Sequence, residues 1–119
     1  MVALRAVIGV DLFMVPGDEN RLTYGRDATC SHVIGRDDVR ISAVHFTIHT
    51  EYNENTGTVK HYVSDRSTNG TWLRGERLEP GYDYDIWAGD VIYMLNPSHD
   101  GYNVSIHSIN TLFWTQCGA

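Results

Sequence analysis

The chain is predicted to fold as one all-β domain, either a sandwich or a barrel of short strands. No long stretch repeats apolar residues at the three- and four-residue spacing of an amphipathic helix. Short strand-like runs dominate instead, and clusters of Gly, Pro, Asn and Asp separate them. Strands this short at this spacing are typical of sandwiches and barrels, whose loops are long enough to carry a binding site.

Seven runs carry strand signals. In the run 45–50, Phe46 and Ile48 alternate with polar residues and therefore share one face. The stretch 52–58 joins two strong strand patterns and contains Gly57, so we expect a hairpin loop there. The predicted strands are 3–10, 21–26, 45–50, 58–63, 70–73, 91–95 and 103–109, with turn signals at 16–18, 35–38, 80–81, 88–90 and 96–97.

Size, charge and cysteine content limit the function. With 119 residues the chain has room for a single domain, 1–119, around one core. Its net charge of −6 makes nucleic acid a poor partner, because phosphate backbones need basic stripes. No apolar run approaches the roughly 18 residues of a membrane span, so no membrane partner is expected. Cys30 and Cys117 are expected to be free thiols in a reducing, intracellular compartment.

Three short motifs carry the polar residues that a phosphate receptor needs. They are Gly25-Arg26, Ser42-Ala43-Val44-His45 and Ser67-Thr68-Asn69-Gly70-Thr71. A phosphorylated side chain carries nearly two negative charges and three acceptor oxygens. Its receptor supplies an arginine fork, a hydroxyl and backbone N–H groups from turns, and loops at one end of a β-sandwich can gather such groups.

In this order the three motifs resemble those of the forkhead-associated (FHA) domain, a β-sandwich that reads phosphothreonine. The resemblance covers about residues 3–110 and implies a two-sheet antiparallel sandwich of about 10 to 11 strands. It implies that Arg26 and Ser42 bind the phosphate. It also implies that Thr68 lines the pocket for the threonine and that Asn69 bonds the peptide backbone. The implied partner is a phosphothreonine-containing protein or peptide, with no cofactor and no metal.

The resemblance also gives three residues a structural role at the site. Gly25 ends an early strand, and Gly70 continues the third motif into the next strand. His45 braces the two loops from behind and does no chemistry, which agrees with the plain reading of a satisfied core histidine.

A second Gly-Arg pair, Gly35-Arg36, competes with Gly25-Arg26 for the phosphate-binding role. Arg36 lies only 6 residues before Ser42, too few for the strand and loop that the family has between these motifs. Arg26 lies 16 residues before Ser42, which fits the family pattern. Arg26 is therefore the expected phosphate ligand.

Arg40 is a candidate for sequence selectivity because it lies two residues before Ser42 in the same loop. Checkpoint-kinase FHA domains can use a basic residue here to read an acidic side chain three positions after the phosphothreonine. We therefore expect a preference for Asp or Glu at plus three; the alternative is that Arg40 is a solvated surface charge. Arg66 and Arg74 border the third motif and are expected to add to the positive field.

Other segments fit the family with two departures. Residues 72–78 resemble its short hairpin, 88–92 its Gly-Asp turn, and 93–103 are expected to form a longer loop before the last strand. Ala43 stands where many members have a polar residue, which removes one contact to the peptide backbone. Cys30-Ser31-His32-Val33 departs mildly from the family's Cys-Asp-aliphatic pattern, away from the phosphate.

The resemblance implies a targeting module of a signalling protein, in a DNA-damage or cell-cycle checkpoint, fused to a kinase or ubiquitin-ligase domain and working in the nucleus. The chain itself is expected not to be an enzyme. One alternative is an FHA-like scaffold or dimerisation module that binds without phosphate, favoured by Tyr82, Tyr84, Trp87 and Trp114, which are expected to be exposed. A β-sandwich hydrolase using Ser42 and His45 is a third reading, without a nucleophile-elbow motif.

Overall fold

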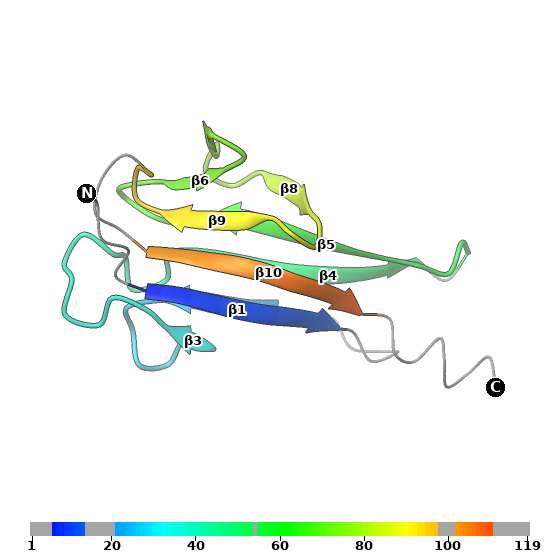
Figure 1. Cartoon of the computed structure of the whole chain (residues 1–119), viewed down its shortest axis with the longest axis horizontal. Coiled ribbons are helices and arrows are strands. Elements are labelled where there is room, and N and C mark those ends of the chain that lie inside the picture. The colour runs from blue at the N-terminus through cyan, green and yellow to red at the C-terminus, as the bar shows by residue number, and fades with distance from the viewer. Residues whose placement is uncertain (1–5, 14–20, 54, 98–101, 111–119) are drawn as a thin grey trace.

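In the computed structural model, residues 6–13, 21–53, 55–97 and 102–110 are described, and they form ten strands and no helix (Figure 1). The all-β prediction is therefore confirmed. No helix in the described ranges has the length and apolar character to cross a membrane. The strands are β1 (Ala6–Phe13), β2 (Arg21–Gly25), β3 (His32–Val33), β4 (Phe46–Asn53), β5 (Thr58–Asp65), β6 (Thr71–Leu73), β7 (Glu76–Arg77), β8 (Asp83–Ile86), β9 (Val91–Met94) and β10 (Tyr102–Asn110).

The strands build two five-stranded sheets. One sheet has the order β1-β10-β9-β6-β7, and the other has the order β3-β2-β4-β5-β8. Most neighbours are antiparallel, as predicted, but β1 pairs with β10 and β2 pairs with β3 in parallel. The parallel β1–β10 pair joins the first and last strands, so both begin at the same end of the molecule (Figure 1).

Several strand boundaries differ from the predicted ones. The first strand is Ala6–Phe13 rather than 3–10, and the hairpin strands β4 and β5 extend to Asn53 and Asp65. The predicted loop 93–103 is shorter, because β9 continues to Met94 and β10 begins at Tyr102. Strands β3 and β8 were not predicted from the local patterns, although the resemblance implies a strand between Arg26 and Ser42, where β3 lies. Both lie at the edge of their sheet, where a strand needs only one partner and little apolar sequence.

The core lies between the two sheets. Phe46 and Ile48 of β4 both point into it, as their alternation predicts, and the ring of Tyr24 stacks on that of Phe46 with centroids 4.6 Å apart. Cys30 is a buried free thiol, whereas Cys117 lies outside the described residues. The other large core side chains are Ile34, Ile41, Val63, Leu73, Leu78, Ile86, Ile92, Met94, Leu95, Tyr102, Val104 and Ile106.

Strand register gathers the three motifs at one end of the sandwich. Tyr24 of β2 pairs with Phe46 at the start of β4, which pairs with Asp65 at the end of β5. The chain therefore leaves β2, enters β4 and leaves β5 at the same end. The loop that carries Arg40 and Ser42 is hydrogen-bonded to the 66–70 loop there, at the end where β1 and β10 begin (Figure 1).

Candidate functional site

Arg26 follows β2 directly and is fixed by the loop that carries the second motif. Its backbone N–H donates to the Ser42 carbonyl at 3.0 Å, and its Nε donates to the Ile41 carbonyl at 2.8 Å. Within the described part of the chain, its two Nη groups make no hydrogen bond. The fork of a half-buried guanidinium is thus oriented by the backbone while its terminal N–H groups stay available to an anion.

Gly25 is required because two backbone segments approach each other there. A Cβ at this position would lie 2.3 Å from the Ala43 carbonyl oxygen and 2.9 Å from the His45 nitrogen. No side chain fits at these separations. The absence of a side chain at Gly25 therefore lets the second motif pack directly on the end of β2.

His45 links the second and third motifs. Its Nδ1 accepts from the Ser42 backbone N–H at 3.2 Å, so its Nε2 carries the proton and donates to the Gly70 carbonyl at 2.7 Å. Burial lowers the pKa of His45, which favours this neutral form. His45 is fully buried, and its two ring hydrogen bonds join the loop of Ser42 to the turn of Gly70.

The same contacts bear on the hydrolase reading. The imidazole of His45 holds the backbone N–H of Ser42, whereas a serine nucleophile needs its hydroxyl on the histidine. The Ser42 hydroxyl instead accepts from the Thr68 backbone N–H at 3.0 Å. Across the described residues, no three His, Cys, Asp or Glu side chains come close enough together to hold a metal ion.

Asp65 organises the third motif, and sequence reasoning did not identify it. Its Oδ1 accepts from the Ser67 N–H at 3.0 Å, the Ser67 hydroxyl at 2.6 Å and the Thr71 hydroxyl at 2.7 Å. The Ser67 hydroxyl in turn accepts from the Gly70 N–H at 2.8 Å. Asp65 is 1% exposed, so a buried carboxylate holds the turn that presents Thr68 and Asn69. An Asp two residues before a Ser-Thr-Asn-Gly turn is the signal that was available.

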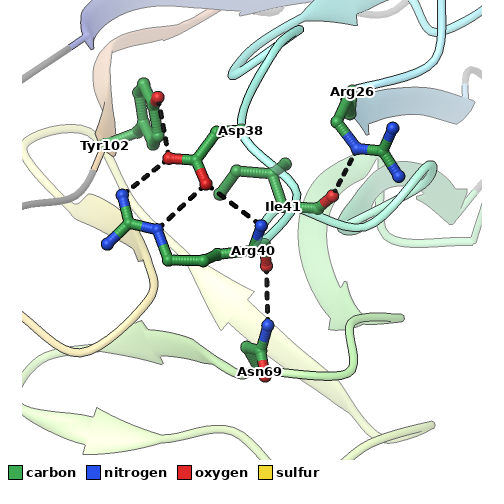
Figure 2. A network of polar contacts seen from close by, with 6 residues as sticks. All are labelled: Arg26, Asp38, Arg40, Ile41, Asn69 and Tyr102. Atoms are coloured by element: carbon green, nitrogen blue, oxygen red, sulfur yellow. Dashed lines mark hydrogen bonds and ion pairs between the residues drawn. The ribbon is translucent and has the colours of Figure 1, made fainter.

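Asn69 connects the third motif to the loop of Arg40. Its Nδ2 donates to the Arg40 carbonyl at 2.9 Å (Figure 2). Thr68 and Asn69 are both exposed, and the amide of Asn69 keeps its oxygen for a further partner. The structure thus brings Arg26, Ser42, Thr68, Asn69 and Arg40 to one end of the sandwich.

Arg40 is engaged by Asp38, a residue that sequence reasoning did not identify. Its Nε donates to Asp38 Oδ1 at 2.9 Å, and its Nη2 donates to Asp38 Oδ2 at 2.6 Å. The Tyr102 hydroxyl adds a hydrogen bond to Oδ2 at 3.1 Å. The hydrogen bonds from Arg40 hold the pKa of Asp38 well below its usual range. Arg26 and Arg40 extend on opposite sides of the Ile41 backbone (Figure 2).

The two other arginines near the third motif behave differently from each other. Arg74 forms an ion pair with Asp90 at 2.6 Å and donates to the Asp85 carbonyl at 3.0 Å, so its charge is neutralised within the fold. The expected contribution of Arg74 to a positive field is therefore largely lost. Arg66 is exposed at the start of the 66–70 loop, where its backbone N–H donates to the His45 carbonyl at 2.9 Å.

Known proteins resemble the chain in sequence and fold. The family model of the FHA domain matches residues 22–94. The FHA domain of MEK1 is 27% identical, with a TM-score of 0.60 over 71% of this chain and 67% of that chain. The N-terminal FHA domain of S. cerevisiae Rad53p, solved with a phosphothreonine peptide, is 32% identical, with a TM-score of 0.53 over 62% of this chain and 55% of that chain.

A further solved structure and a comparison with curated proteins add to these findings. The MEK1 FHA domain in complex with the HOP1 pThr318 peptide is 29% identical, with a TM-score of 0.58 over 63% of this chain and 72% of that chain. Among curated proteins, none matches the chain significantly. Because the family model spans well over half of the 119 residues and the solved structures share the sandwich, the chain belongs to the FHA domain family.

Proposed function

We propose that the chain is a module that recognises phosphothreonine peptides. In this proposal Arg26 and Ser42 hold the phosphate, Thr68 lines the pocket for the threonine, and Asn69 holds the peptide backbone. The observation that carries it is that Arg26, whose Nη groups bond none of the described residues, is tied to the loop of Ser42, whose hydroxyl accepts from the Thr68 turn. FHA domains of Rad53p and MEK1, solved with phosphothreonine peptides, support it.

The hydrogen-bonding capacity of each group fits its role. The Ser42 hydroxyl accepts from Thr68 and therefore has its own proton left to donate to a phosphate oxygen. The Asn69 amide donates to the Arg40 carbonyl and has its oxygen left to accept from a peptide N–H. The Nη groups of Arg26 supply the charge-assisted bonds, which are the strongest of the set.

The affinity is expected to be modest and to depend on salt. A single charged anchor on an open surface gives a Kd of about 1 µM or weaker, or about −8 kcal/mol. The net charge of −6 opposes approach of an anionic peptide, so the attraction must come from the local field of Arg26. Added salt screens this exposed pair, and binding therefore weakens.

Arg40 is proposed to give a preference for Asp or Glu three residues after the phosphothreonine. It lies directly beside Asn69, which is the group proposed to hold the peptide backbone. A groove lined by 35–40 and Tyr102 opens next to it. A peptide held by Asn69 would place a downstream side chain near this groove.

The wider context of the module is proposed from its relatives. We propose a nuclear role in checkpoint or DNA-damage signalling, which is the context that the resemblance of the three motifs implies, and there the domain would target its parent protein to phosphorylated partners. A domain of this kind binds and does no chemistry. The proposed partner is thus a phosphorylated protein in the cell interior.

A titration with matched peptides tests the proposal. One peptide with Asp at plus three is prepared with phosphothreonine, phosphoserine or unmodified threonine and titrated into wild type, Arg26→Ala and Arg21→Ala. Arg21 is exposed at the far end of β2, so its loss removes the same charge away from the site. Binding of the phosphothreonine form alone, lost in Arg26→Ala and kept in Arg21→Ala, is expected. Equal binding of all three forms would refute the proposal.

A second candidate function is a scaffold or dimerisation module that binds without phosphate. Tyr82 and Trp87 favour it, because they are 65% and 57% exposed near the edge strand β8. Tyr84 is half-buried and accepts a hydrogen bond from the Glu79 N–H, and Trp114 lies outside the described residues. A pulldown from lysate with and without phosphatase treatment separates the two functions, since only the scaffold would keep its partner after treatment.

A further inference from the structure

The charge of Arg40 is already satisfied within the fold. The Asp38 carboxylate takes the Nε and one Nη2 proton, which together form one of the guanidinium edges that a carboxylate can bridge. Asp38 also accepts from the Arg40 backbone N–H at 3.0 Å and from the Tyr102 hydroxyl, so four donors hold it in place. The Asp38 side chain is 15% exposed and the Arg40 side chain is 42% exposed.

The described residues that line the groove beside this pair carry no net formal charge. It is lined by Arg36 and Arg40 against Asp37 and Asp38, together with Tyr102 and a Val39 that is 86% exposed. Two positive and two negative formal charges cancel, and Val39 and Tyr102 add apolar surface. A peptide side chain entering the groove therefore meets a neutral surface as long as Asp38 stays on Arg40.

We infer that Asp38 is an internal competitor that sets the selectivity of the domain at the position downstream of the phosphothreonine. This inference rests on the proposed function and adds a residue that regulates it. Asp38 lies two residues from Arg40 in the same loop, so its effective concentration at the guanidinium is on the order of millimolar or higher. A peptide carboxylate therefore gains only the difference in free energy between its own bond to Arg40 and the Asp38 bond that it displaces.

The expected consequence is a weak acidic preference in wild type that becomes strong when Asp38 is neutralised. Asp38→Asn keeps an acceptor for the Arg40 N–H but removes the charge, so the peptide carboxylate no longer competes with the Asp38 carboxylate for Arg40. A newly available arginine–carboxylate contact then favours the acidic peptide by about tenfold. Tyr102→Phe removes one of the four donors to Asp38 and is expected to give an intermediate preference.

The test compares two phosphothreonine peptides that differ only by Asp or Ala at plus three. Wild type is expected to prefer Asp by less than about threefold, and Asp38→Asn by about tenfold. In the Asp38→Asn/Arg40→Ala double variant the preference is expected to vanish, because Asp38 acts through Arg40. An unchanged preference in Asp38→Asn overturns the inference while leaving phosphopeptide recognition intact. Absence of any phosphopeptide binding overturns the proposed function and this inference with it.

A measurement without peptide tests the pair itself. The carboxyl carbon of Asp38 is followed by NMR against pH in wild type and Arg40→Ala. Asp38 is expected to stay ionised well below the usual range in wild type and to titrate closer to an ordinary Asp in Arg40→Ala. An ordinary titration of Asp38 in wild type would overturn the inference, since the carboxylate would then not occupy Arg40 in solution.

Discussion

Replacing Gly25 by Ala tests whether close backbone packing positions the phosphate site. The new Cβ would lie 2.3 Å from the Ala43 oxygen and 2.9 Å from the Ala43 carbon, where ordinary contacts begin at 3.4 Å. The two segments must therefore separate by about 1 Å, because the Cβ is fixed to its own backbone and the atoms that it meets are backbone. The bonds from Arg26 N to the Ser42 carbonyl and from His45 N to the Tyr24 carbonyl, 3.0 and 2.7 Å long, stretch as a result.

The expected cost has two parts. Overpacking destabilises the fold by about 1 to 3 kcal/mol, of which the reduced freedom of the unfolded chain offsets less than 1 kcal/mol. Displacement of Ser42 from Arg26 weakens at least one charge-assisted bond to phosphate, which lowers affinity about tenfold or more. Urea unfolding measures the first effect, and a phosphopeptide titration under conditions where the variant stays folded measures the second.

Gly75→Ala is the matched control. A Cβ at Gly75 meets no atom within 4 Å, although the φ of +80° makes Ala strained there by about 1 kcal/mol. It lies in the turn between β6 and β7, so stability should fall while phosphopeptide affinity stays unchanged. If folded Gly25→Ala binds the phosphopeptide within about twofold of wild type, the reasoning from backbone packing is wrong.

Three further predictions concern buried polar groups. Burial lowers the pKa of His61 to about 4, so the neutral ring stabilises the fold above the unfolded pKa near 6.5, and this contribution is lost as pH falls toward 4. Up to about 3 kcal/mol of folding stability should be lost between pH 7 and 4. Urea unfolding of wild type and His61→Leu across this range measures the loss, and the stability of the variant should depend less on pH. His45→Ala leaves the Ser42 N–H and the Gly70 carbonyl without their His45 partner. The free energy of unfolding should fall by about 2 to 4 kcal/mol, and phosphopeptide affinity should drop more than tenfold. Unchanged affinity in the folded variant would contradict the bracing role. Asp65→Ala removes the acceptor of three hydrogen bonds and should lower the free energy of unfolding by about 2 to 4 kcal/mol, measured with heat or urea. Asp65→Asn retains an acceptor and should lower it by less. Equal losses of stability in the two variants would argue against the hydrogen-bond account.

Local patterns were enough to predict the fold class and the strands that build the core. Phe46 and Ile48 alternate because one face of β4 is buried, and this periodicity is visible in the sequence. The short strands β3 and β8 could not be predicted in this way. Asp83–Ile86 is an edge strand with two exposed Asp side chains, and its pairing with β5 depends on the approach of distant residues.

At the site, too, some features could be predicted from the sequence and others depend on how distant residues meet after folding. The motifs predict structural roles for Gly25, His45 and Gly70. A Cβ at either glycine would clash with its neighbours, and His45 Nε2 donates to the Gly70 carbonyl. Asp65 and the Asp38–Arg40 pair were missed because their importance comes from which atoms face each other after folding. An Asp in a polar loop has the same local signature whether its carboxylate is solvated or holds an arginine.

The most direct test of phosphothreonine recognition is to map the bound peptide on the protein by NMR. Backbone amide shifts are compared with and without a phosphothreonine peptide, and again with the unphosphorylated peptide. We expect the phosphorylated form alone to shift the amides of Arg26, Ser42, Thr68 and Asn69 at the loop end. Shifts confined to the surface of Tyr82 and Trp87, or equal shifts with both peptides, would contradict the account.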